Sequence, residues 1–98
     1  MNHRQLQIKY LTKELLDVFL RAAQKRTQFN KFDKENNTWE WVLYERMSLL
    51  DRVNEFRRSN KLPEVGVDNI INAEKKAIGH TDYASKLALY CAEVAVLS

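Results

Sequence analysis

The stretch that decides the fold is DYASKLALYCAEVAVL, residues 82–97 of a 98-residue chain. After Asp82 its charged residues are Lys86 and Glu93, which lie seven residues apart and define one narrow polar strip on a helix. Nearly every other position is apolar, so a helix formed by this stretch must be buried on several sides. A chain this short has little other protein to cover it. The stretch therefore predicts the central helix of a bundle or a helix at an oligomer contact.

The remainder of the chain also predicts helices. Apolar residues recur at three- and four-residue spacing over about 3–29 and 38–59, and a shorter helix is expected over about 69–78. Strand patterns are absent, and two glycines and one proline offer little turn chemistry for a sheet. The chain therefore predicts a single all-α domain, residues 1–98, built as a small bundle of three long helices and one short helix.

Several residues are candidates for ending or beginning these helices. Asn2 and Gln5 are spaced for a capping box at the start of the first helix. Asn37 or Thr38 is expected to cap the second helix, while Pro63 and Gly66 follow its end. The remaining predictions are a cap by Asp68 for the short helix, a stop at Gly79, and a cap by Thr81 for the last helix.

Arg46 is the most unusual residue on the predicted apolar face of the second helix. It lies among the apolar side chains of that helix, where an unpaired buried guanidinium would be costly. Glu93, the single acid within the apolar last helix, is the partner we predict for a structural ion pair. The alternatives are that Arg46 extends to the edge of the bundle or that it binds a ligand. The predicted face comprises Trp39, Val42, Leu43, Leu50 and Val53, with Leu49 and Phe56 on its shoulder.

Composition limits the function only broadly. The net charge of +3 permits nucleic-acid binding without arguing for it. Cys91 is the single cysteine, so no disulfide forms within the chain, and the polar N-terminal residues do not resemble a secretory signal. We therefore expect a cytoplasmic protein that does not bind membranes. His3, His80 and Cys91 lack the spacing of a zinc site, and no metal or other cofactor is predicted.

The segment 31–45 carries a family resemblance. Lys31-Phe32-Asp33 followed by residues 39–45 resembles the start of the MazG-type all-α nucleotide pyrophosphohydrolases. In that family a lysine–aromatic pair precedes a helix with a Glu-Glu-x-x-Glu motif, and Glu-x-x-Asp opens the next long helix. Glu45 matches the first motif and Asp82 matches the second.

The other acids of the two motifs are missing. Tyr44 and Ser48 replace two glutamates of the first motif, and Gly79 replaces the glutamate of the second. The family uses the full set of carboxylates to hold Mg²⁺ against a nucleoside triphosphate. The resemblance therefore implies a degenerate relative without hydrolytic activity.

The function we predict is a non-enzymatic interaction protein, meaning an adaptor, inhibitor or regulator of the kind that phages and mobile elements carry. It would act through a helical surface and form a homodimer or other homo-oligomer, with Ala84, Ala88, Ala92 and Ala95 as a seam for self-association or for packing within the chain. Tryptophan, tyrosine and arginine are frequent interface anchors. The candidate partner-binding residues are Trp41, Tyr44, Phe56, Arg57 and Arg58.

The alternative function is nucleic-acid binding. A basic stretch with interleaved aromatic residues is able to follow phosphates. The candidates are Arg21, Lys25, Arg26, Lys31 and Lys34, or the basic residues between 57 and 61.

Overall fold

The structure is a computed structural model that describes residues 2–29 and 38–97, with side chains for residues 2–25 and 43–97. The described residues form four α-helices: α1 (His3–Phe29), α2 (Thr38–Ser59), α3 (Val67–Ala77) and α4 (Tyr83–Leu97). The predicted all-α fold of three long helices and one short helix is confirmed. None of the helices in this part of the chain has the length and hydrophobicity needed to cross a lipid bilayer.

The helix ends show which of the predicted caps form. Asn2 and Gln5 make the reciprocal capping box, with Asn2 N 3.1 Å from Gln5 Oε1 and Gln5 N 2.9 Å from Asn2 Oδ1. Gly79 follows α3 with a φ of +96°, a conformation that favours glycine. The prediction for Asp68 was wrong, because Gly66 is the N-cap of α3 and Asp68 lies in its first turn. Thr81 lies two residues before α4, whose first bond runs from Lys86 N to the carbonyl of Asp82.

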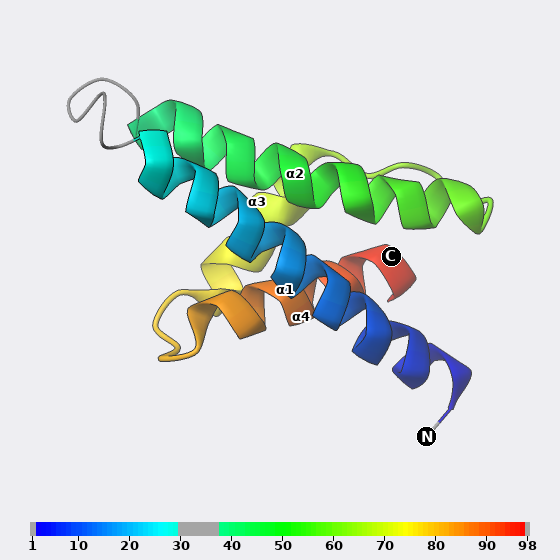
Figure 1. The fold of residues 1–98 in the computed structure, drawn as a ribbon. Helices are drawn as coiled ribbons and strands as arrows, with labels where there is room; N and C mark the ends of the chain where they lie inside the picture. Colours follow the sequence, from blue (N-terminus) through cyan, green and yellow to red (C-terminus); the bar gives the residue numbers. More distant parts are fainter. Residues whose placement is uncertain (1, 30–37, 98) are drawn as a thin grey trace.

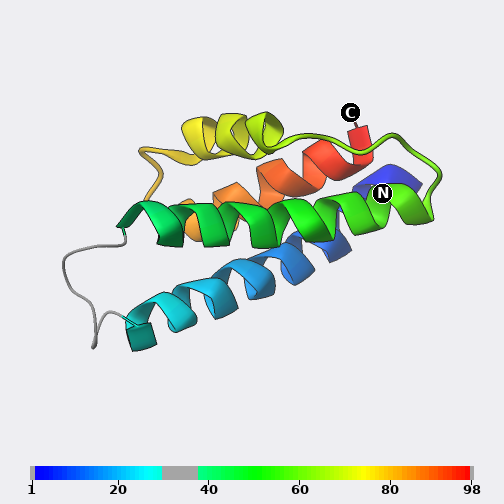
Figure 2. The ribbon, with the colours of Figure 1, turned by 90° about the horizontal axis from the view of Figure 1, so that it is seen from above.

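Helix α4 occupies the centre of the molecule and contacts the other three helices. Among the described residues no backbone contact joins α1 to α3, and these two helices cover opposite sides of α4, while α2 packs along the remaining side (Figures 1 and 2). Ala88, Ala92 and Ala95 are fully buried, so these small side chains serve packing within the chain. Leu87, Ala88, Cys91, Ala92 and Ala95 form the buried part of α4.

The core joins α4 to residues from each of the other helices. Leu15 of α1, Leu49 and Val53 of α2 and Ile70 of α3 have no exposed surface. Full burial of a leucine or isoleucine side chain stabilises a fold by about 1.5–3 kcal/mol, so this cluster supplies the main stabilisation of the bundle. Leu49 was expected on the shoulder of α2 but is fully buried within this cluster.

Helices α1 and α2 run antiparallel, and one end of this hairpin extends past α3 and α4. In both ribbon views the last turns of α1 and the first turns of α2 lie beyond the near ends of the other two helices (Figures 1 and 2). This arrangement explains why Leu43, expected on the buried face together with Leu50, is 43% exposed. That prediction was wrong because helical periodicity does not reveal where the covering helices end.

The connection from α2 to α3 is held by backbone hydrogen bonds. Leu62 N donates to the carbonyl of Arg57 at 2.8 Å, and Lys61 N donates to that of Arg58 at 3.1 Å. These two bonds form a Schellman motif, in which the residue after the C-cap adopts the left-handed conformation. That residue is Lys61, with a φ of +58°. A lysine therefore occupies a position that glycine would fill at lower conformational cost.

Candidate functional site

Arg57 was predicted to bind a partner or phosphate at the surface, and the structure contradicts this. Its side chain is 3% exposed. Nη1 lies 3.2 Å from the carbonyl oxygen of Val94 and 3.0 Å from that of Ala95, and Nε donates to the carbonyl of Pro63. Val94 and Ala95 lie in the last turn of α4, where carbonyls lack helical partners and a cation is favoured. Arg57 is therefore a structural residue that caps α4.

Arg46 forms an ion pair, but its carboxylate partner is Glu74 of α3. The prediction that Arg46 pairs with Glu93 was therefore wrong. Arg46 Nε and Nη2 both donate to the Glu74 carboxylate at 2.8–3.0 Å, and the two side chains are 17% and 15% exposed. This hydrogen bonding raises the pKa of Arg46 above its ordinary value, although burial acts in the opposite direction. The pair joins α2 to α3.

Tyr83 of α4 belongs to the same polar region. Burial, followed by the nearby carboxylates of Glu74 and Glu45, raises the pKa of the Tyr83 hydroxyl. Its ring meets Phe19 of α1 edge-on, with centroids 6.2 Å apart. These contacts link side chains from all four helices near the start of α4. The polar region therefore has a structural role, because it holds the four helices together.

Tyr44 lies on a groove of about 380 Å³ between α1 and α2. The ammonium of Lys25 stands over the Tyr44 ring, 5.6 Å from its centroid, within the range of a cation–π contact. The groove brings Tyr44, a predicted partner-binding residue, together with two predicted nucleic-acid-binding residues. It is lined by Val18, Arg21, Ala22, Lys25, Tyr44 and Ser48.

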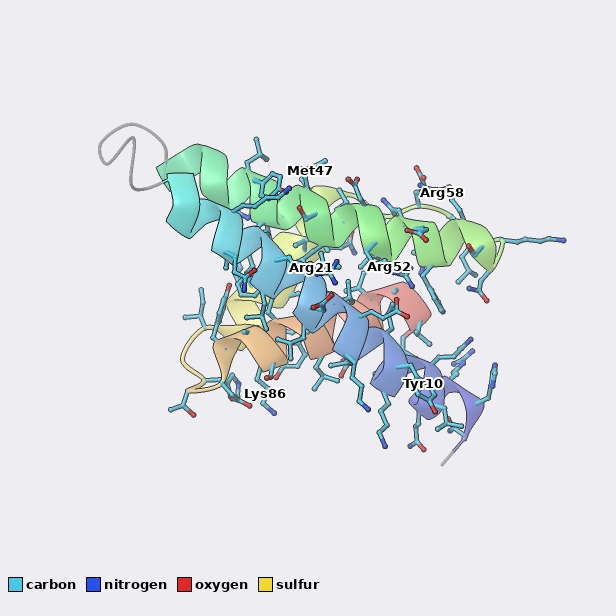
Figure 3. The ribbon with its side chains drawn as sticks, in the orientation of Figure 1. Tyr10, Arg21, Met47, Arg52, Arg58 and Lys86 are labelled. Atoms are coloured by element: carbon cyan, nitrogen blue, oxygen red, sulfur yellow. The ribbon has the colours of Figure 1, made fainter. Side chains whose placement is uncertain are left out.

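Exposed apolar side chains adjoin this groove on α2. Leu43, Tyr44 and Met47 are 43%, 38% and 40% exposed, and their spacing places them next to one another on the helix. Figure 3 shows Met47 on the outer side of α2 and Arg21 on α1. We call Leu43, Tyr44, Met47, Arg21 and Lys25 the hairpin-end surface.

The predicted basic residues do not gather into one described patch. Arg21 pairs with Asp17 at 3.0 Å, and Arg58 pairs with Glu64. Since Arg57 is buried, the stretch 57–61 offers fewer free cations than its sequence suggests. Lys31 and Lys34 lie outside the described residues, and the side chain of Arg26 lies outside the described side chains.

Phe56 and Trp41 are the two remaining aromatic residues predicted to bind a partner. Phe56 is partly buried and packs against the core, so only part of its ring is available to a partner. The side chain of Trp41 lies outside the described side chains, and its prediction stays open.

A second groove, between α3 and α4, was missed by the sequence analysis. It has a volume of about 470 Å³ and is lined by Asn69, Asn72, Ala73, Lys76, Tyr90 and Val94. The ammonium of Lys76 lies 5.9 Å from the centroid of the Tyr90 ring. Two asparagines inside a short helix are weak helix formers, and this was the only signal in the sequence that marked the position.

The described side chains contain no group of three or more His, Cys, Asp and Glu residues placed to hold a metal ion. Glu45, which matches the first pyrophosphohydrolase motif, is partly buried on α2, and Asp82, which matches the second, is exposed before α4. Cys91 is fully buried, and burial raises the pKa of its thiol to about 12. The described thiol is therefore unsuited to nucleophilic chemistry at neutral pH.

Comparison of the chain with protein-family models, with curated proteins and with solved structures finds no match.

Proposed function

We propose that this protein is a non-enzymatic adaptor, inhibitor or regulator that contacts another protein through its hairpin-end surface. The observation that carries the proposal is the exposure of Leu43, Tyr44 and Met47 side by side near the start of α2. Exposed apolar side chains that adjoin one another favour burial against a partner. Met47 is accessible because it lies on the outer side of α2 (Figure 3), although its neighbour Arg46 reaches Glu74 of α3.

The chemistry of the hairpin-end surface suits a protein partner. Tyrosine is frequent among interface hot spots, and methionine adapts its shape to irregular apolar surfaces. Arg21 and Lys25 lie beside this apolar centre and supply a charged rim, as in many protein interfaces. For nucleic acid, the same two cations give less support because Arg21 is already paired with Asp17.

Self-association is part of the proposal, and the structure changes the surface that we assign to it. The alanines of α4 were one predicted seam, but Ala88, Ala92 and Ala95 are covered by the chain's own helices. We therefore assign the homodimer contact to the hairpin-end surface as well. A contact of this type is self-complementary, with the same patch contributed by each copy.

Affinity capture from the source cell with three forms of the protein tests the proposed function. The forms are the unchanged protein, Met47→Glu and the matched control Tyr10→Glu. Tyr10 is 63% exposed on α1, far from Met47 and towards the other end of the molecule (Figure 3). The expected result is that the unchanged protein and Tyr10→Glu retain the same partner, whereas Met47→Glu loses it.

Light scattering of the same three forms tests the dimer. A dimer is expected for the unchanged protein and for Tyr10→Glu, and a monomer for Met47→Glu. Retention of both partner and dimer by Met47→Glu, with an unchanged circular dichroism spectrum, would remove this surface from the account.

A further inference from the structure

We infer that the groove between α3 and α4 binds an extended peptide that carries an acidic residue. This inference rests on the proposed role in protein binding, but it uses a different surface. The groove contains Asn69, Asn72 and Lys76, which follow one another on α3 at spacings of three and four residues. Such residues share one helix face, so the three polar groups form a row along the groove.

The carboxamides of Asn69 and Asn72 make no hydrogen bond to any described residue of the chain. In contrast, the side chains of Asn2, Asn54 and Asn60 all have such partners. Asparagine favours helices less than alanine does, and it is commonest where its side chain bonds to the backbone nearby. Two unused carboxamides at the side of a groove are therefore available to a ligand.

Asn54 shows how a carboxamide on a helix of this protein bonds to a non-helical backbone. Its Nδ2 lies 3.0 Å from the carbonyl oxygen of Val65, and its Oδ1 accepts from Val65 N at 2.8 Å. Both backbone groups of one non-helical residue are thus satisfied by one side chain. Asn69 and Asn72 carry the same donor and acceptor, so they are suited to the backbone of a peptide.

The dimensions and the charge of the groove limit the length and the charge of the peptide that it can bind. From Asn69 to Lys76 the helix rises about 10 Å, which is the length of about three residues in an extended chain. Lys76 makes no ion pair with the described residues and supplies a positive charge at one end of the row. Val94 and the Tyr90 ring form the opposite side of the groove and suit an apolar side chain.

Glu93 limits where the acidic residue of the peptide can lie. A neighbouring space of about 220 Å³ shares Lys76, Tyr90 and Val94 with the groove and is also lined by Glu93 and Leu97. A second carboxylate there would be repelled by Glu93. The structure therefore favours a short segment with one acidic residue at Lys76 and an apolar residue against Val94.

The test begins by panning a phage-displayed library of random 12-residue peptides against the folded protein. The enriched peptides are then synthesised with a fluorescent label, and their affinity is measured by fluorescence polarisation. The comparison uses the unchanged protein, Asn69→Ala/Asn72→Ala, Lys76→Met and Met47→Glu. Alanine is the better helix former, so the double variant is expected to fold, and circular dichroism checks this.

We expect peptides with one acidic residue that bind the double variant at least tenfold more weakly. Lys76→Met should also weaken binding, whereas Met47→Glu should leave it unchanged. In NMR spectra of the complex, the side-chain amides of Asn69 and Asn72 should shift and that of Asn54 should not. No enriched peptide, enriched peptides without an acidic residue, or equal affinity for the double variant would overturn the inference. The proposed function is tested separately, because it depends on Met47.

Discussion

The guanidinium of Arg57 donates a hydrogen bond to the carbonyl oxygen of Ala95, 3.0 Å away, and thereby ties the end of α2 to the end of α4. The same side chain holds the carbonyls of Val94 and Pro63, so one buried cation joins two helices and the connection that follows α2.

Arg57→Ala should lower the free energy of unfolding by about 3 kcal/mol, because three carbonyls in a buried region lose a charged donor. Arg57→Lys should recover part of this loss, since an ammonium cannot reach all three acceptors from one position. The adjacent Arg58, whose side chain is exposed and pairs with Glu64, provides the matched control. Arg58→Ala should change stability by less than about 0.5 kcal/mol in urea denaturation. Equal losses for the two alanine variants would contradict the buried role of Arg57.

The Arg46–Glu74 pair should contribute more than an exposed ion pair. A double-mutant cycle with Arg46→Met and Glu74→Gln is expected to give a coupling energy of about 1–2 kcal/mol. The same cycle on Arg58 and Glu64, which are 59% and 55% exposed, should give about 0.3 kcal/mol. Replacing Glu93 by Gln should leave the stability effect of Arg46→Met unchanged. A coupling between Arg46 and Glu93 as large as that with Glu74 would argue against the observed pairing.

Lys61→Gly should raise the free energy of unfolding by about 1 kcal/mol, because Lys61 has a φ of +58° and glycine adopts this conformation without the Cβ penalty. Gly79→Ala provides the reverse test. No neighbouring atom lies within 4 Å of a Cβ at Gly79, so its cost of about 1 kcal/mol should come from the backbone at φ +96° alone. Thermal denaturation of both variants measures these effects, and a destabilised Lys61→Gly protein would be the contrary result.

Alkaline pH should destabilise the fold partly through Cys91. Burial raises the pKa of this thiol from 9.0 to about 12, so the folded state holds the proton more tightly than the unfolded chain does. The resulting stability is complete below pH 9 and is lost as the pH rises towards 12. Cys91→Ala should therefore show a shallower fall in stability over this range than the unchanged protein. Tyr83, whose pKa is also raised, is present in both proteins and does not alter the comparison. Parallel curves for the two proteins would contradict this role of burial.

The helices and the central place of α4 could be predicted from the sequence because they follow from periodicity and from the near absence of polar positions in residues 83–97. The burial of Arg57 also had a signal, since it lies four residues after Val53 and seven after Leu50 on one face of α2. The cluster of Arg57, Arg58 and Lys61 at the end of this helix predicts a basic surface instead, and for Arg57 this prediction is wrong. Its position on the apolar face of α2 correctly indicates that its side chain is buried.

Other features depend on how the helices are placed relative to one another. The partner of Arg46 could not be predicted because α3 and α4 both contact α2. The sequence does not decide which of these two helices faces Arg46. Leu43 is exposed because the hairpin extends past its neighbours, although it shares a helix face with Leu50. The groove at Asn69 and Asn72 forms only once α3 has packed on α4, so spacing along either helix alone does not define it.

The measurement that tests the central claim most directly is amide hydrogen exchange of α4 in the Met47→Glu protein, which we expect to be monomeric, at low micromolar concentration. Leu87, Ala88, Cys91, Ala92 and Ala95 are buried within one copy of the chain, so its own helices cover α4. We therefore predict that amides between Leu87 and Ala95 exchange among the slowest in the protein and that their protection does not change on further dilution. Exchange at the rate of an unstructured peptide, or protection that disappears on dilution, would show that α4 is covered by another molecule and would contradict the account.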